Sequence, residues 1–210
     1  MLSRRAAVAT LPLVALIVLA GNILGAALAL VWILLWRIDV REVGLVRPRS
    51  WWRSITIGVL AGVALKLVMK AVVMPLLGAP ETNSAYHFLT GNRAALPGML
   101  FTVVVAGGFG EELVWRGLLF YHLRLIVGTT ARAQVGIVAL TSLLFGLAHY
   151  HDQGLGGVEQ SIITGLAFGS AFAMTRSIWP IMAAHASYDV VAVALIFAGK
   201  EAALAHSLFR

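Results

Sequence analysis

Six apolar stretches dominate this sequence, and most of them are long enough to cross a lipid bilayer. A membrane-spanning helix needs roughly 20 mostly apolar residues at 1.5 Å per residue. Lipid offers no hydrogen-bond partner to backbone groups, so each of these segments must be helical. The expected spans are about Pro12–Trp36, Ser54–Leu77, Leu96–Leu119, Ala133–His149, Gln160–Thr175 and Ile178–Ala198. The sequence therefore predicts an all-α, polytopic transmembrane helical bundle of about six spans.

The composition supports a membrane protein and excludes several other classes. Of the 210 residues, 60% are hydrophobic and only 12% are charged, against about 25% charged residues in ordinary soluble domains. The absence of cysteine excludes disulfides, thiolate metal ligands and a cysteine nucleophile. The net charge of +7 comes from arginines clustered between apolar runs, which favours anionic lipid over nucleic acid as the partner. We expect a multi-pass protein of the cell membrane, in contact with the lipid bilayer.

Two adjacent carboxylates lie in the third apolar stretch. A carboxylate at the centre of a span costs roughly 2.5–3.5 kcal/mol on the insertion scale, so it usually faces a cavity or a partner. Glu112 and Arg116 are four residues apart, in the order that favours a helical ion pair. Successive helical residues differ by about 100° in direction, so Glu111 is expected to point elsewhere, without a local cation. An unpaired carboxyl group suits general acid–base chemistry; the alternative is that both glutamates are structural.

Histidines mark two further apolar stretches. Phe145 and His149 are four residues apart, so they lie on one helical face. His185 and Asp189 have the same spacing, and such a pair can orient a catalytic tautomer, hold a metal, stabilise a developing charge or simply stabilise the helix. All of these polar groups need shelter from lipid, and one cavity shared by three helices is the economical arrangement. Such a cavity would contain the groups needed to activate water against a carbonyl.

Three motifs follow one another along these stretches. They read Glu111-Glu112-x-x-x-Arg116, Phe145-x-x-x-His149 and His185-x-x-x-Asp189. Together they resemble the pattern of the CAAX-protease and bacteriocin-processing (CPBP or Abi) intramembrane proteases, the family related to CAAX prenyl protease 2. The resemblance covers a catalytic helical core at about residues 96–198. Residues 1–95 are expected to form N-terminal spans and linkers, and residues 199–210 a short tail.

The resemblance implies an intramembrane endopeptidase that hydrolyses CAAX-type or bacteriocin-leader substrates, which are peptides or membrane proteins. By this resemblance, Glu111 with His149 would activate the attacking water, and His185 with Asp189 would stabilise the oxyanion. The other motif positions would hold the site in shape: Glu112, Arg116 and Phe145. Glu111, His149 and His185 would also make a His₂Glu zinc set. A zinc-assisted mechanism and a metal-free glutamate mechanism are therefore both open.

Two other functions stay open on the sequence. One is a non-enzymatic protein on the same fold, active in bacteriocin self-immunity or in partner binding. The other is a small transporter, suggested by the intramembrane acids and lysines, although the inversely repeated broken helices of many carriers are not seen.

Two polar features lie outside the motifs. Lys66 and Lys70 are one turn apart in the second stretch, so they form a basic stripe. They either reach toward lipid phosphate or attract the terminal carboxylate of a substrate. The glycine-rich segment Tyr150–Glu159 is predicted to be a loop, with His151 and Asp152 on its solvated rim.

Overall fold

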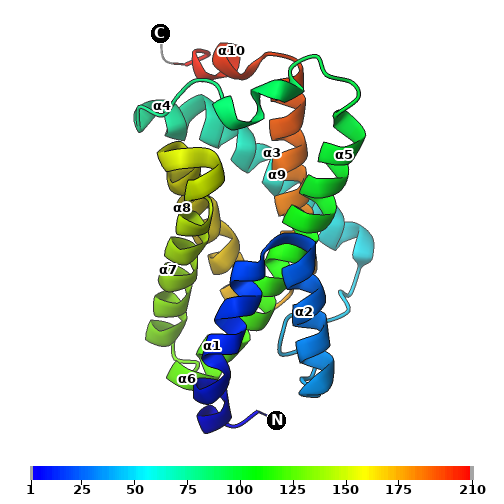
Figure 1. The fold of residues 1–210 in the computed structure, drawn as a ribbon, viewed down its shortest axis with the longest axis vertical. Coiled ribbons are helices and arrows are strands. Elements are labelled where there is room, and N and C mark those ends of the chain that lie inside the picture. The colour runs from blue at the N-terminus through cyan, green and yellow to red at the C-terminus, as the bar shows by residue number, and fades with distance from the viewer. Residues whose placement is uncertain (1, 209–210) are drawn as a thin grey trace.

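The computed structural model describes residues 2–208, which form helices and connecting segments without a β-strand. The helices pack into an elongated bundle with the first and last helices at opposite ends (Figure 1). The elements are α1 (Arg4–Ala20), α2 (Asn22–Leu35), α3 (Trp51–Val68), η1 (Met69–Val73), α4 (Met74–Leu76), η2 (Ser84–Leu89), α5 (Leu96–Phe101), η3 (Thr102–Glu111), η4 (Leu113–Leu119), α6 (Phe120–Val127), α7 (Ala131–Ala148), α8 (Tyr150–Thr175), α9 (Trp179–Phe197) and α10 (Glu201–Ala205). The predicted all-α polytopic bundle is confirmed.

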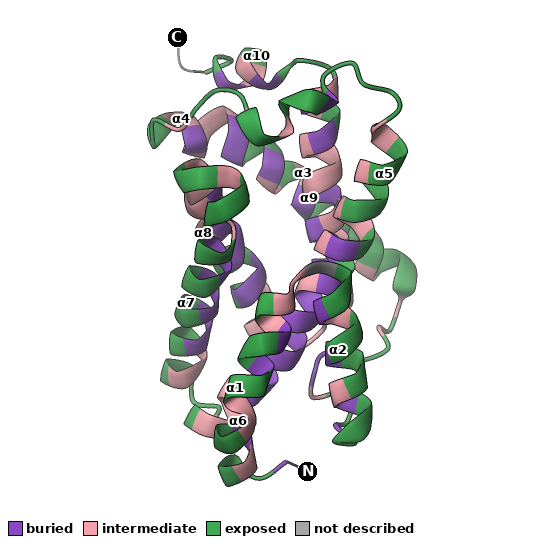
Figure 2. Cartoon of the chain, viewed as in Figure 1, coloured by how far each residue is buried: buried purple, intermediate pink, exposed green. Residues whose placement is uncertain are grey.

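Four helical segments within residues 2–208 are long and apolar enough to cross a membrane. They are Trp51–Leu76, Leu96–Val127, Ala131–Ala148 and Trp179–Phe197, and they correspond to the second, third, fourth and sixth predicted spans. Exposed residues cover much of their outer faces (Figure 2), and many of these side chains are large and apolar. A soluble monomer rarely exposes so much apolar surface, so these faces suit lipid.

The first predicted span is wrong as a single helix. The chain breaks at Gly21, where φ is +60°, a conformation that glycine adopts without steric cost. α1 and α2 then fold back on each other as a hairpin (Figure 1). Gly25 lies so close to α1 that a Cβ atom there would be 2.8 Å from the carbonyl oxygen of Ile17. α2 has only 14 residues, fewer than the roughly 20 that a span needs.

The predicted loop after the fourth span is also wrong. Tyr150 begins α8, so the helix that contains the fifth predicted span starts ten residues before Gln160. The glycine-rich part is accommodated by a kink at Gly154, where φ is +63°. His151 and Asp152 are exposed, as expected of a solvated rim.

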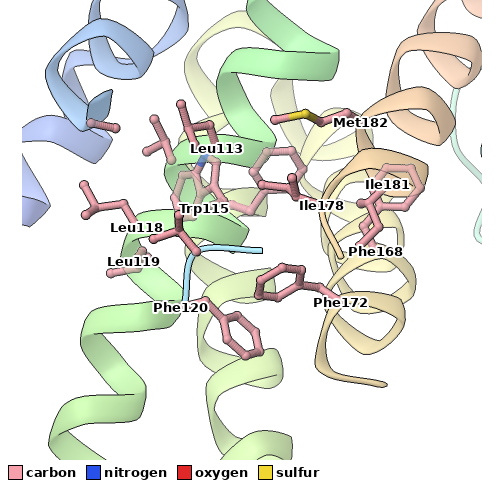
Figure 3. Packing of buried hydrophobic residues seen from close by; sticks show 14 of the residues in the cluster. Leu113, Trp115, Leu118, Leu119, Phe120, Phe168, Phe172, Ile178, Ile181 and Met182 are labelled. Atoms are coloured by element: carbon pink, nitrogen blue, oxygen red, sulfur yellow. The ribbon is translucent and has the colours of Figure 1, made fainter. Parts of the chain in front are cut away.

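The core lies where η4, α8 and α9 meet. Figure 3 shows Trp115, Phe168 and Ile181 among the side chains packed there, and all three are buried. Because these helices carry or flank the motif residues, tight packing here limits how far the polar side chains can move.

Two glycines let α3 lie directly against α9. A Cβ atom at Gly58 would be 2.2 Å from the carbonyl oxygen of Pro180, and one at Gly62 would be 2.0 Å from that of Ala184. Small residues at such contacts let helix backbones approach closely. α9 also packs against η3, so the contact with α3 helps to fix the position of the helix that carries His185 and Asp189.

Candidate active site

The motif residues come from three parts of the bundle. Glu111 and Glu112 lie at the junction of η3 and η4, His149 caps the end of α7, and His185 lies in α9. η3 approaches α9 closely because it presents glycines: a Cβ atom at Gly108 would be 2.6 Å from that of Ala186. The close approach of η3 to α9 therefore depends on glycine at this position.

His185 is surrounded by three carboxylates. Its Nδ1 atom is 2.6 Å from Oε1 of Glu112. On the other edge of the ring, Nε2 is 3.4 Å from Oδ2 of Asp189 and 3.9 Å from Oε2 of Glu111. With Nδ1–H donating to Glu112, the Nε2 atom is the one available for chemistry.

The twin glutamates both reach the same imidazole, one at each ring nitrogen. Regular α-helical geometry predicts that they point in different directions. The helix is instead π-helical through η3 and η4, with backbone hydrogen bonds to the fifth residue and a wider turn. This widening, together with the two nitrogens of His185, allows Glu111 and Glu112 to contact one partner. The sequence does not reveal the contact between His185 and Glu112.

Glu112 and Arg116 form the expected ion pair, deep in the bundle. Arg116 Nη1 donates to Glu112 Oε1 at 2.9 Å, and Nη2 donates to the carbonyl oxygen of Gly165 at 3.4 Å. The guanidinium carbon also lies 4.7 Å from the ring centroid of Phe145. Both charged side chains are almost fully buried, with exposed fractions of 2% and 0%. This pair anchors the carboxylate that holds His185.

His149 is oriented by its own helix. Its Nδ1–H donates to the carbonyl oxygen of Phe145 at 2.7 Å, which leaves Nε2 as the atom that can accept a proton. The imidazole packs edge-on against the Phe145 ring, with centroids 4.6 Å apart. Within residues 2–208, no carboxylate lies within 4.0 Å of the His149 ring nitrogens.

One cavity of about 560 Å³ is lined by the four predicted catalytic side chains: Glu111, His149, His185 and Asp189. Its wall also includes Lys66, Gln160 and Tyr86, which the motifs do not contain. The charge of Lys66 within an apolar span could have drawn attention to it, since intramembrane charges usually face a cavity. Tyr86 lies in the connection before the third span, and no motif or charge in the sequence marked it as a site residue.

Tyr86 is a neutral hydrogen-bonding group at this cavity. Burial raises the pKa of its hydroxyl, and so do the nearby negative charges, Asp152 before Asp189 and Glu111. A hydrogen bond with Gln153 acts in the opposite direction. The phenol therefore keeps its proton over the physiological range and can donate a hydrogen bond.

Among residues 2–208, no group of three His, Cys, Asp or Glu side chains has the arrangement needed to hold a metal ion. In the proposed set of Glu111, His149 and His185, Nδ1 of each histidine has a hydrogen-bond partner, as is usual for a histidine that binds a metal through its other nitrogen. The remaining His185 nitrogen is nearer to Asp189 than to Glu111.

The segment that carries the three motifs is similar to a known protein family. The family model described as type II CAAX prenyl endopeptidase Rce1-like matches residues 93–191, the segment that contains all three motifs. This segment belongs to the Rce1-like family. No curated protein and no solved structure matches it. Rce1-like proteins are integral membrane proteases. The chain is therefore an integral membrane protein, and the family match indicates a CAAX-type endopeptidase.

Proposed function

We propose that this chain hydrolyses a peptide bond close to the C-terminus of a membrane-bound substrate, within the cavity between η3, α7 and α9. The observation that carries the proposal is the convergence of Glu111, His149, His185 and Asp189 on that one cavity. A further support is the match to CAAX-type endopeptidases over the segment that supplies them.

Glu111 is the proposed general base. Its carboxylate lies on the cavity wall beside His185, and Nε2 of His149 can accept a second hydrogen bond from the attacking water. Removing a proton from water in the transition state accelerates such reactions by about 10²–10⁴-fold. The proton then passes to the leaving amine, as peptide hydrolysis requires.

His185 is the proposed donor to the oxyanion that forms on the scissile carbonyl. Its Nδ1–H is held by Glu112, so a second proton on Nε2 can donate toward the cavity. In the resting site this proton faces Asp189 at 3.4 Å, and a developing oxyanion would compete for it. Donors fixed before the reaction stabilise the transition state most effectively. Glu112 and Arg116 thereby act as positioning residues.

The test is cleavage of a prenylated CAAX peptide by the purified protein in lipid nanodiscs. Glu111→Gln keeps the shape of the side chain and removes the base, so the rate should fall by at least about 100-fold with an unchanged thermal unfolding profile. Glu159→Gln is the matched control, because Glu159 lies outside the cavity; its rate should stay within about twofold. Cleavage at the wild-type rate by Glu111→Gln would refute the proposed role.

A further inference from the structure

Lys66 is a buried basic residue on the cavity wall, and no carboxylate of the described residues is in direct contact with it. Its side chain is 94% buried, with a relative exposure of 6%, so it does not extend to lipid headgroups. Its Nζ atom donates to Oε1 of Gln160 at 3.2 Å and lies 4.6 Å from the ring centroid of Tyr188. No carboxylate of residues 2–208 lies within 4.0 Å of it.

Lys70, one turn further along the same helix, is different. Its ammonium pairs with Glu201 at 3.4 Å and also donates to the carbonyl oxygen of Glu81. Burying a charge is costly unless it is paired. The two lysines therefore share a cavity wall, but in the described part of the chain only Lys70 is in direct contact with a carboxylate.

The same wall holds a second group without a partner. The hydroxyl of Tyr188 is buried and has no hydrogen-bond partner within residues 2–208. Gln160 uses its amide oxygen for Lys66, and its amide nitrogen can donate elsewhere. A cation, an amide donor and a hydroxyl donor close to one another have the chemistry that binds a carboxylate.

We propose that Lys66, with Gln160 beside it, binds the C-terminal carboxylate of the peptide substrate. This inference rests on the proposed function, in which the scissile bond is near the C-terminus. A C-terminal stretch of three extended residues spans at most about 10 Å, and Lys66 and Glu111 line the same cavity. Binding of the C-terminal carboxylate at Lys66 would place the scissile peptide bond near Glu111.

The test compares two peptides of one sequence, one ending in a free carboxylate and one in a carboxamide. A hydrogen bond to a charged group contributes about 1.5–3 kcal/mol, so the wild-type protein should prefer the free acid by about 10–100-fold in kcat/KM, mainly through KM. In Lys66→Gln this ratio should fall to near 1, and Lys66→Arg should recover part of it. Lys70→Gln is the matched control and should keep the wild-type preference, because its charge is already paired.

Binding of both peptides to Glu111→Gln, measured by fluorescence anisotropy, separates this inference from the proposed function. Preferential binding of the acid through Lys66 without any cleavage by the wild type would support the anchor and reject proteolysis. Cleavage of acid and amide with equal kcat/KM would overturn the anchor while leaving proteolysis standing. Lys66→Gln could instead reduce the kcat/KM of both peptides equally, with activity restored when Asp189→Asn is added. That result would also overturn the anchor, because Lys66 would then only balance the charge of Asp189.

Discussion

Gly62→Ala should disable the site although Gly62 does not line the cavity. The new Cβ atom would lie 2.0 Å from the carbonyl oxygen of Ala184 and 2.2 Å from Oγ of Ser187. A hydroxyl can rotate away, but a helical carbonyl cannot. Ordinary contact begins at 3.4 Å, so α3 and α9 must separate locally by about 1.4 Å, because packed interiors have no free space to absorb the methyl group.

The cost follows from this separation. Forcing one extra methyl group into a packed interface costs about 1–3 kcal/mol. The 3.1 Å hydrogen bond from Ser187 to the carbonyl oxygen of Val59, which joins the same two helices, is worth about 1 kcal/mol more. We therefore expect a loss of about 2–4 kcal/mol in the free energy of unfolding. His185 directly follows Ala184, and a displacement of about 1 Å can reduce an enzymatic rate by 10²-fold.

Thermal unfolding in detergent and peptide cleavage at a temperature where the variant stays folded measure the two effects. The matched control is Gly136→Ala in α7, where nothing lies within 4 Å of the new Cβ atom. Alanine is favoured over glycine in a helix by about 1 kcal/mol, so this control should unfold at the same or a higher temperature. Equal behaviour of the two alanine variants in both assays would refute the reasoning about the helix contact.

Two further predictions concern the groups around His185. Glu112→Gln leaves the guanidinium of Arg116 buried without its counter-ion, so the free energy of unfolding should fall by about 3–5 kcal/mol, and adding Arg116→Met should recover part of that loss in thermal unfolding. An unaltered stability of Glu112→Gln would contradict the burial of this pair. A metal-free mechanism, in which Glu111 activates the water directly, predicts that incubation with a strong chelator leaves cleavage within about twofold of the untreated rate. Loss of activity that returns with added zinc would show instead that Glu111, His149 and His185 bind a metal.

Local spacing predicts part of this site from the chain alone. Glu112 and Arg116, four residues apart, pair as the helical repeat predicts. Phe145 and His149 stack on one face, and His185 and Asp189 approach each other across one turn. These contacts join residues about one helical turn apart, so they could be anticipated without knowing which helices are neighbours.

The environment of the chain also follows from the sequence. Long apolar runs with few charges require helices in lipid, because backbone groups have no other partner there. Hydropathy does not specify direction, however, and a glycine within an apolar run is compatible with either a straight helix or a reversal. For this reason the hairpin at Gly21 and the early start of α8 at Tyr150 were not anticipated.

Contacts between distant residues depended on the tertiary structure. Glu112 and His185 are 73 positions apart, and Lys66 and Gln160 are 94 apart. No helical period relates such positions; helix packing brings them together, through glycines that let α9 lie against both α3 and η3. The sequence alone determined that the chain lies in the membrane and which polar groups its spans carry. The packing decided which of these groups share a cavity, because proximity between separate helices is set by the shapes of the surfaces between them.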